Sequence, residues 1–234
     1  LTEPYKCSFV DLVSTAKTQP PKWFVSHAWS TPFSQTVSML NLHVESRGLP
    51  PTTPFWICTF ANNQHDLGEL AGDVLQTPFA KAILLPDTVG TLLLVDANCT
   101  PMTRAWCVLE AWVTTIKATG KRFDVAAMIP EGAQRTTKRT IQPGPALRMD
   151  LGNGAHKDVV GPENGWVPGT VATAGVAVKV EKAEASQKKD LESILRILAG
   201  SDKDAPPPAH CQGYDAVNKA YHALFRGPAM YELA

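Results

Sequence analysis

The sequence has no excess of charge of either sign. Lys and Arg together number 22, Asp and Glu together also number 22, and charged residues form only 19% of the chain. A protein that binds a nucleic-acid backbone needs a basic face, and a disordered acidic tail needs a block of carboxylates. We therefore expect a folded chain with no nucleic-acid partner.

Long hydrophobic runs are also missing. The longest candidate, residues 83–95, is interrupted by Pro86, Asp87 and Gly90, whereas a membrane-spanning helix needs about 20 apolar residues. The first four residues do not resemble the start of a signal peptide. The sequence thus predicts no membrane partner, and its first residue, Leu1, indicates a fragment or a processed product.

The cysteines lack the spacing of a metal site or a redox pair. There are five, none of them in a C-x-x-C pair, and the six histidines are scattered along the chain. Cysteines inside apolar runs are typical of buried free thiols in a reducing compartment. We expect five reduced cysteines, no metal site and a cytoplasmic location.

Several common catalytic motifs are absent. The sequence contains no G-x-G-x-x-G after a strand, no Walker A motif, no G-x-S-x-G and no H-E-x-x-H. These absences remove support for an ordinary dinucleotide-binding, P-loop, hydrolase or zinc-protease site.

Four short apolar runs predict the strands of a buried parallel sheet, at residues 23–26, 55–60, 91–96 and 125–129. The segments between them are long enough for helices, and this alternation is typical of an α/β fold.

The predicted helices have clear boundaries. Thr31 caps the first, which ends at Gly48, and Thr100 caps a second, which ends at Gly120. Shorter helices are predicted at residues 66–71 and 78–85.

The amino-acid composition changes from about residue 130 to 169, where seven Gly and five Pro occur. We interpret this stretch as a surface insertion, or as a loop that orders against a partner. The alternation of Val176, Val178 and Val180 then predicts a half-exposed strand. A helix follows at residues 186–198, and residues 201–234 form a linker with a last helix at 214–225.

The most informative segment is an apolar helix that carries Glu110. Residues 105–113 read A-W-C-V-L-E-A-W-V, with Glu110 as the only charge. Burial on so apolar a surface raises the pKa of a carboxyl group. Two interpretations remain open: a pocket carboxylate near the carboxyl ends of the strands, where α/β sheets bind ligands, or a structural carboxylate paired with Arg104 or Arg122.

A second candidate lies at the end of the first predicted strand. Ser26, His27 and Trp29 occur just before a helix N-terminus, a position that favours anionic ligands. The indole of Trp29 can stack on a base or a nicotinamide ring. The alternative is that Trp29 packs under the sheet edge and His27 is an ordinary surface imidazole.

A third candidate follows the second predicted strand. Residues 62–65 read N-N-Q-H, and their amide and imidazole groups can bind a polar ligand. They can equally satisfy backbone groups of their own loop.

Two short runs resemble TIR-type domains. Residues 24–26 read F-V-S, as in the first strand of that family, and residues 106–110 read W-C-V-L-E, similar to its W-C-L-x-E run. The S-H-A-W and A-N-N-Q-H runs also resemble a TIR-like group of algae and other protists. The resemblance covers residues 22–130 and extends to about residue 200.

The resemblance implies a flavodoxin-like, three-layer α/β sandwich with a parallel sheet of four or five strands, over residues 22–200. It implies that Glu110 is the catalytic residue of an NAD glycohydrolase, for which NAD is the substrate and no cofactor is needed. The residues implied in nucleotide binding are Ser26, His27, Trp29, Asn62, Asn63 and Trp106.

Other TIR domains imply a different function. Many are adaptors, and many act only when self-associated, so a non-catalytic protein–protein interaction module is the alternative. The nucleoside deoxyribosyltransferases, a related fold that also uses a Glu at an N-glycosidic bond, are a lesser enzyme alternative.

Overall fold

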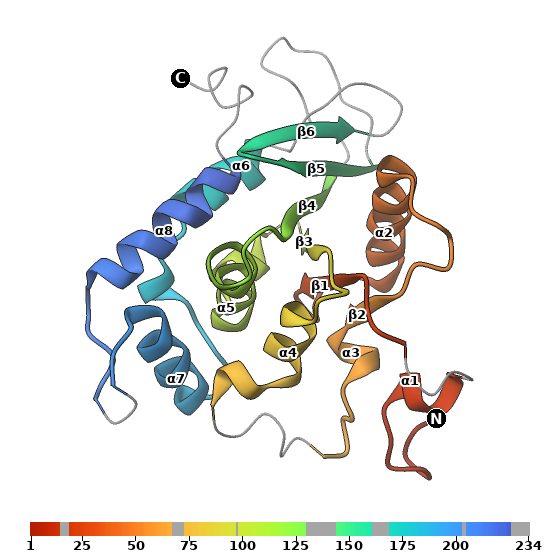
Figure 1. The fold of residues 1–234 in the computed structure, drawn as a ribbon, viewed down its shortest axis with the longest axis horizontal. Coiled ribbons are helices and arrows are strands. Elements are labelled where there is room, and N and C mark those ends of the chain that lie inside the picture. The colour runs from red at the N-terminus through yellow and green to blue at the C-terminus, as the bar shows by residue number, and fades with distance from the viewer. Residues whose placement is uncertain are drawn as a thin grey trace.

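The computed structural model shows an α/β fold built on one six-stranded sheet (Figure 1). The structure describes residues 1–14, 19–66, 73–96, 98–129, 144–160, 169–202 and 205–225. The strand order is β2-β1-β3-β4-β5-β6. The strands are β1 (Trp23–His27), β2 (Phe55–Ile57), β3 (Gly90–Val95), β4 (Arg122–Ile129), β5 (Gly144–Gly152) and β6 (Ala155–Val160).

The sheet is mixed rather than wholly parallel. Strands β2, β1, β3 and β4 are parallel to one another, while β5 pairs antiparallel with β4 and β6 pairs antiparallel with β5. The prediction of a parallel sheet of four or five strands is therefore confirmed for the first four strands. The sequence analysis did not predict the antiparallel hairpin of β5 and β6 that extends the sheet.

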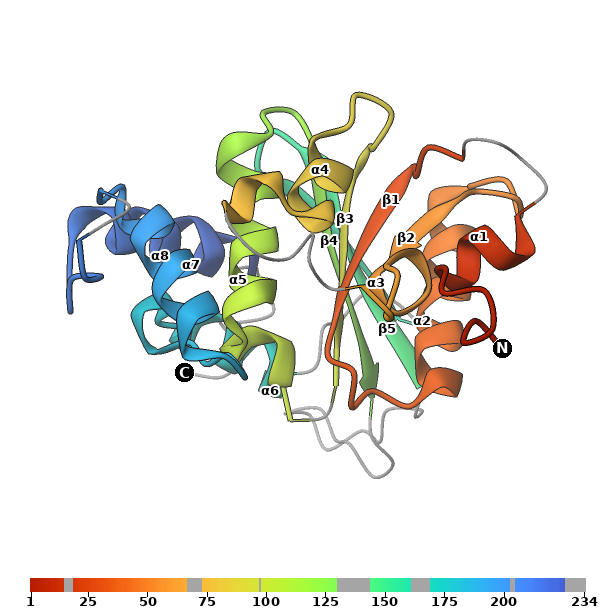
Figure 2. The same ribbon diagram turned by 90° about the horizontal axis from the view of Figure 1, so that it is seen from below.

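Helices cover both faces of the sheet. Figure 2 shows α1, α2 and α3 on one side, α4 and α5 on the other, and α6, α7 and α8 beyond α5. The helices are α1 (Phe9–Val13), α2 (Phe33–Arg47), α3 (Cys58–Ala61), α4 (Pro78–Leu84), α5 (Ala105–Trp112), α6 (Gly169–Ala177), α7 (Lys188–Ala199) and α8 (Gln212–Phe225). None of those in the described part of the chain combines the length and apolar character needed to cross a bilayer.

Strand β3 is at the centre of the sheet, as its apolar sequence predicts. All six of its residues are buried, and Leu92, Leu93, Leu94 and Val95 are each 0% exposed. Leu92 and Leu94 pack in the cluster under α2, whereas Leu93 and Val95 pack in the larger cluster under α4 and α5. Alternate side chains on a strand point to opposite faces, so a strand covered on both faces has no polar side.

Part of the stretch 130–169, which we interpreted as an insertion, belongs to the sheet. Residues 144–160 form the β5–β6 hairpin, and Leu147 and Met149 of β5 pack with α2. The alternating apolar positions of this strand were hidden by Gly144 and Pro145 at its start. Residues 130–143 and 161–168 of the expected insertion lie outside the described residues.

The strand predicted from the valine alternation is also wrong. Residues 169–177 form α6 and Val180–Lys182 form a 3-10 turn. A Cβ atom on Gly175 of α6 would lie 2.1 Å from the ring of Phe225, so the glycine lets α8 approach α6 closely. Helix α8, within the expected C-terminal segment 201–234, also packs against α7.

Several element boundaries differ from expectation. Strand β2 ends at Ile57 and gives way to α3, and Pro32 rather than Thr31 occupies the N-cap position of α2. The helix expected to run on to Gly120 is instead a 3-10 turn (Thr100–Thr103), then α5, then a π-helical turn (Val113–Lys117). The short helix predicted at 66–71 lies almost wholly outside the described residues.

Candidate functional site

The carboxyl ends of the parallel strands bring three separate parts of the sequence together. Ser26 and His27 end β1, Cys58 follows β2 directly, and α5 lies against this edge of the sheet. Ligand sites in α/β sheets form at this edge, where the chain leaves neighbouring strands in opposite directions. The order β2-β1-β3 places such a point between β1 and β3.

Glu110 and Ser26 are in direct contact at this edge. The Ser26 hydroxyl donates a hydrogen bond of 2.5 Å to Oε2 of Glu110. Ser26 is 1% exposed and Glu110 is 5% exposed. The hydroxyl that was expected to contact a ligand therefore positions the carboxyl group of Glu110.

Burial controls the ionisation of Glu110. It raises the pKa of this carboxyl to about 8, while the Ser26 hydroxyl and the positive charge of Arg104 act in the opposite direction. Neither arginine considered from the sequence neutralises Glu110 directly: among the described residues Arg122 lies 3.9 Å from Asp150, and Arg104 acts only at longer range. A carboxyl with a strongly raised pKa beside a sheet edge is typical of a functional site.

Local structure fixes the helix that carries Glu110. The backbone of Ala105 donates to the carbonyl of Glu184 and the backbone of Glu184 donates to Thr103, each at 2.8 Å, which joins the start of α5 to the segment before α7. At the other end, the Thr114 hydroxyl donates to the carbonyl of Glu110 at 2.8 Å. Such bonds to the preceding turn compete with helix geometry, and a π-helical turn follows.

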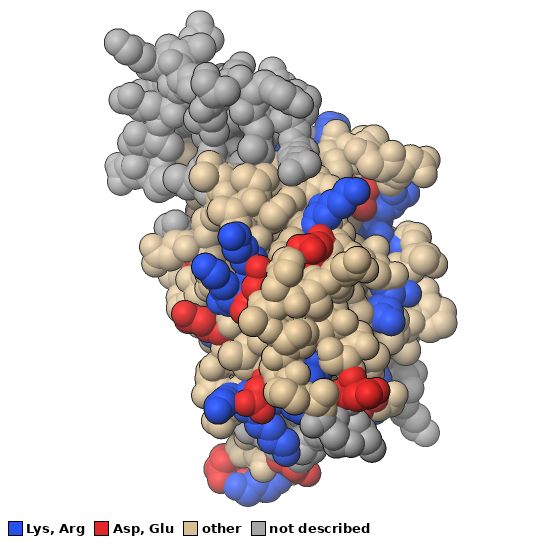
Figure 3. Space-filling model, turned by 90° about the vertical axis from the view of Figure 1, so that its left-hand side faces the viewer, with Lys and Arg blue, Asp and Glu red and all other residues tan. Residues whose placement is uncertain are grey.

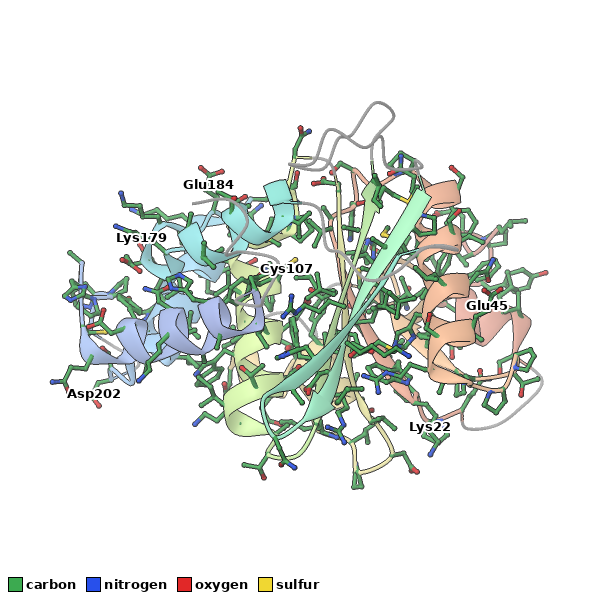
Figure 4. All side chains as sticks on the ribbon, turned by 90° about the horizontal axis from the view of Figure 1, so that it is seen from above. Lys22, Glu45, Cys107, Lys179, Glu184 and Asp202 are labelled. Carbon is green, nitrogen blue, oxygen red and sulfur yellow. The ribbon has the colours of Figure 1, made fainter. Side chains whose placement is uncertain are left out.

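Cys107 lies one helical turn before Glu110. Its thiol is 3.8 Å from the carbonyl oxygen of His27, and Figure 4 shows the residue between the ribbon of α5 and the sheet. Burial, reinforced by the nearby Glu110, raises the pKa of the Cys107 thiol far above its usual range. Cys107 is therefore an unreactive packing group, and all five cysteines are free thiols, as predicted.

His27 and Trp29 converge on a residue that the sequence analysis did not select. The Cys58 thiol lies 3.5 Å from Nε2 of His27 and accepts a hydrogen bond of 3.2 Å from Nε1 of Trp29. Trp29 is 66% exposed, which excludes the expectation that it packs under the sheet edge. The indole N–H of Trp29 thus donates to the Cys58 thiol, while much of the ring is exposed to solvent.

The two asparagines have separate positions. Asn62 is partly buried, and its backbone N–H closes α3 by donating to the carbonyl of Cys58 at 3.1 Å. The Asn63 side chain donates to the carbonyl of Lys6 at 2.8 Å, and His65 contacts Thr2 at 2.9 Å. This loop therefore holds the N-terminal segment, and Asn63 is not gathered with Glu110.

Trp106 packs against other aromatic rings. Its ring lies 5.2 Å from that of Phe79, which in turn lies 5.4 Å from Trp56, and Trp56 stacks on Phe24. The residue is part of the apolar cluster on this face of the sheet. Packing in this cluster is sufficient to explain why the W-C-V-L-E run begins with a tryptophan.

Tyr221 of α8 is a second residue that the sequence analysis missed. It is 2% exposed, and its hydroxyl has no hydrogen-bond partner among the described residues. Burial raises the pKa of this hydroxyl, and the neighbouring Cys107, Cys99 and Glu110 raise it further. The sequence pattern that could have revealed Tyr221 is its spacing of seven residues from Tyr214, which puts both hydroxyl-bearing rings on one buried face of a helix.

The described residues contain no group of three His, Cys, Asp or Glu side chains that could hold a metal ion. On the side where α7 and α8 lie, acidic and basic side chains are interspersed (Figure 3).

Comparison of the chain with protein-family models, with curated proteins and with solved structures finds no match.

Proposed function

We propose that this chain is a TIR-like domain of flavodoxin-like topology that cleaves the nicotinamide–ribose bond of NAD. One observation carries the proposal: the Ser26 hydroxyl bonds to the Glu110 carboxyl at the carboxyl edge of β1 and β3. The two residues belong to the two sequence runs that resemble TIR domains. Their contact forms a buried carboxyl site at the edge where parallel sheets bind nucleotides.

Glu110 supplies the charge that the reaction needs. When the bond between C1′ of the ribose and the nicotinamide nitrogen breaks, its electron pair leaves with nicotinamide and C1′ becomes oxocarbenium-like. An ionised carboxylate in a low-dielectric site stabilises that positive charge, and water then adds to C1′. Trp29, with its exposed ring, is the residue for stacking on a base.

The ionisation of Glu110 sets the pH dependence. With a pKa raised to about 8, the carboxyl is mostly protonated at neutral pH, and the positive nicotinamide ring of bound NAD favours the ionised form. The value of kcat/KM should therefore rise as the pH increases toward about 8, because the ionised carboxylate is the active form.

The direct test is incubation with NAD and measurement of nicotinamide release across a range of protein concentrations. Glu110→Gln should lower the rate by about 100-fold or more, since the developing charge is no longer stabilised. Glu45→Gln, at an exposed position of α2, is the matched control and should keep the wild-type rate. Absence of nicotinamide at every protein concentration contradicts the proposal.

A second candidate, a non-catalytic interaction module, is favoured by the outer surface beside the site. Three exposed apolar residues lie here: Trp29, which is 66% exposed, in the turn before α2, and Phe33 and Val37, which are 64% and 37% exposed, at the start of α2. An uncharged apolar strip is complementary to a copy of itself, so a symmetric dimer is the expected assembly. Phe33→Ser should then abolish concentration-dependent association in sedimentation, while Val89→Ser, at an exposed apolar residue outside the strip, should not.

A further inference from the structure

His27 is oriented so that one ring nitrogen faces a thiol. Its Nδ1 lies 3.1 Å from the carbonyl oxygen of Ala28, and its Nε2 lies 3.5 Å from Sγ of Cys58. A carbonyl can only accept a hydrogen bond, so Nδ1 carries the proton in the neutral ring. Nε2 then presents its lone pair to the Cys58 thiol. A base held by a third group and aimed at a nucleophile is the arrangement of Cys–His catalysis.

The surroundings keep both partners neutral at rest. Burial lowers the pKa of His27, and the positive charge of Arg104 lowers it further. Burial also raises the pKa of the Cys58 thiol, and the hydrogen bond from Trp29 only partly opposes this rise. A neutral imidazole next to a neutral thiol is the protonation state in which the imidazole can act as a general base.

Trp29 supplies a donor at the sulfur. Its Nε1–H donates to Sγ at 3.2 Å, and this bond strengthens when the thiol loses its proton. Cys58 itself is 7% exposed, whereas Trp29 is 66% exposed. Trp29 is therefore an exposed side chain in direct contact with the sulfur, and exposed side chains change rotamer within nanoseconds.

We propose that Cys58 is a nucleophile, activated by His27, that accepts an acyl group from an activated ester or a thioester. This activity is independent of NAD cleavage and does not use Glu110. In the acylation step the thiol proton moves to Nε2 of His27, and the sulfur electron pair forms a bond to the carbonyl carbon. The bond from that carbon to the alcohol or thiol leaving group breaks, and the leaving group takes the proton from His27. Water then hydrolyses the S-acyl group and restores the thiol.

The probe for this proposal is p-nitrophenyl acetate, with the acetylated cysteine identified by peptide mass. Cys99 is the matched internal control, because it is also 7% exposed and burial, with a further contribution from Asp96, likewise raises the pKa of its thiol. Cys58 should be acetylated about 100-fold faster than Cys99, which is the contribution expected of a positioned general base. Equal rates at the two cysteines overturn the proposal.

The pH profile provides a test that needs no variant. If His27 is the base, acetylation of Cys58 should be nearly constant from about pH 7 to 8.5, because a lowered imidazole pKa leaves the base already neutral there. An unassisted thiol with a raised pKa reacts about tenfold faster for each pH unit over the same range, because its thiolate fraction increases. A tenfold rise per unit at Cys58 overturns the proposal.

His27→Gln removes the base and should slow acetylation of Cys58 by about 100-fold. Trp29→Phe keeps an aromatic ring but removes the indole N–H donor, and should slow it by about 10-fold. Cys107, which is 3% exposed, reports folding in the same samples: its continued protection shows that a variant is folded. A folded His27→Gln protein that is acetylated at the wild-type rate overturns the proposal, and if that variant unfolds, the wild-type pH profile decides.

Discussion

Ser26 and Glu110 are 84 positions apart in the sequence, and the hydroxyl of one donates a 2.5 Å hydrogen bond to the carboxyl of the other. The bond joins the C-terminal end of β1 to α5, the helix that follows β3. It determines which way the Glu110 carboxyl faces, and it opposes the rise in pKa that burial causes.

Ser26→Ala should therefore change the pH dependence of NAD cleavage. Loss of the donor raises the pKa of Glu110 further, so the rise in kcat/KM should move to higher pH, and stability should fall by about 1 kcal/mol. Ser30→Ala, at an exposed position in the next turn, is the control. An unchanged pH profile with Ser26→Ala contradicts the assigned role of this hydroxyl.

Glu110→Gln should also alter the pH dependence of stability. The carboxyl pKa is about 8 in the folded chain and 4.5 as its usual value, so between these values the folded state binds more protons than the unfolded state. Wild-type stability should then fall as the pH rises through this window, by up to about 1.4 kcal/mol per pH unit from this group. Urea titrations of both proteins at pH 5, 7 and 9 measure the difference, which should increasingly favour the glutamine variant.

At Asp124, which bonds to His43 and Arg47 of α2, the pH dependence of stability runs in the opposite direction. This carboxylate is 0% exposed and accepts bonds from His43 at 2.9 Å and from Nε of Arg47 at 2.8 Å. Burial alone would raise its pKa, but these two partners outweigh that effect and hold the pKa below the usual value of 3.8. Its contribution to stability is complete above about pH 4 and should be lost as the pH falls through the lowered pKa.

Asp124→Asn tests that network directly at neutral pH. The change leaves Arg47 partly buried without its carboxylate, so the free energy of unfolding should fall by about 3–5 kcal/mol. Asp87→Asn removes an exposed ion pair with Lys22 and should cost less than about 1 kcal/mol. Similar losses for the two variants would argue against a stabilising buried network.

Leu93→Ala should create a cavity at the centre of the sheet. The side chain is 0% exposed, and such truncations cost about 2–5 kcal/mol. Leu84→Ala, at a residue 42% exposed, should cost far less. Chemical denaturation of both variants gives the comparison.

Tyr221→Phe should leave stability unchanged or raise it by about 1 kcal/mol. The hydroxyl is buried and has no hydrogen-bond partner among the described residues, so its removal relieves a desolvation cost. Tyr5→Phe, at a residue 68% exposed, provides a neutral reference for the thermal melts. A loss of more than 1 kcal/mol would show that the hydroxyl has a partner in solution.

The sequence by itself determined the α/β class and the four parallel strands, because apolar runs bounded by turn residues are a local signal. It also singled out Glu110 as a candidate, since one carboxylate in an apolar helix is conspicuous without coordinates. The hairpin of β5 and β6 escaped detection because its alternation begins among Gly and Pro. The valine alternation at residues 176–180 misled because these residues span the end of α6 and the 3-10 turn that follows it.

Only the tertiary structure decided which side chains meet. Nothing near Cys58 in the sequence indicates His27 as its neighbour; the two are adjacent because β1 and β2 are paired in parallel and end at the same edge. The same holds for Ser26 and Glu110, and for the exclusion of Asn63, whose amide holds Lys6. Periodicity fixes which face of an element is buried, but strand order fixes which buried groups face one another, and strand order is a property of the whole chain.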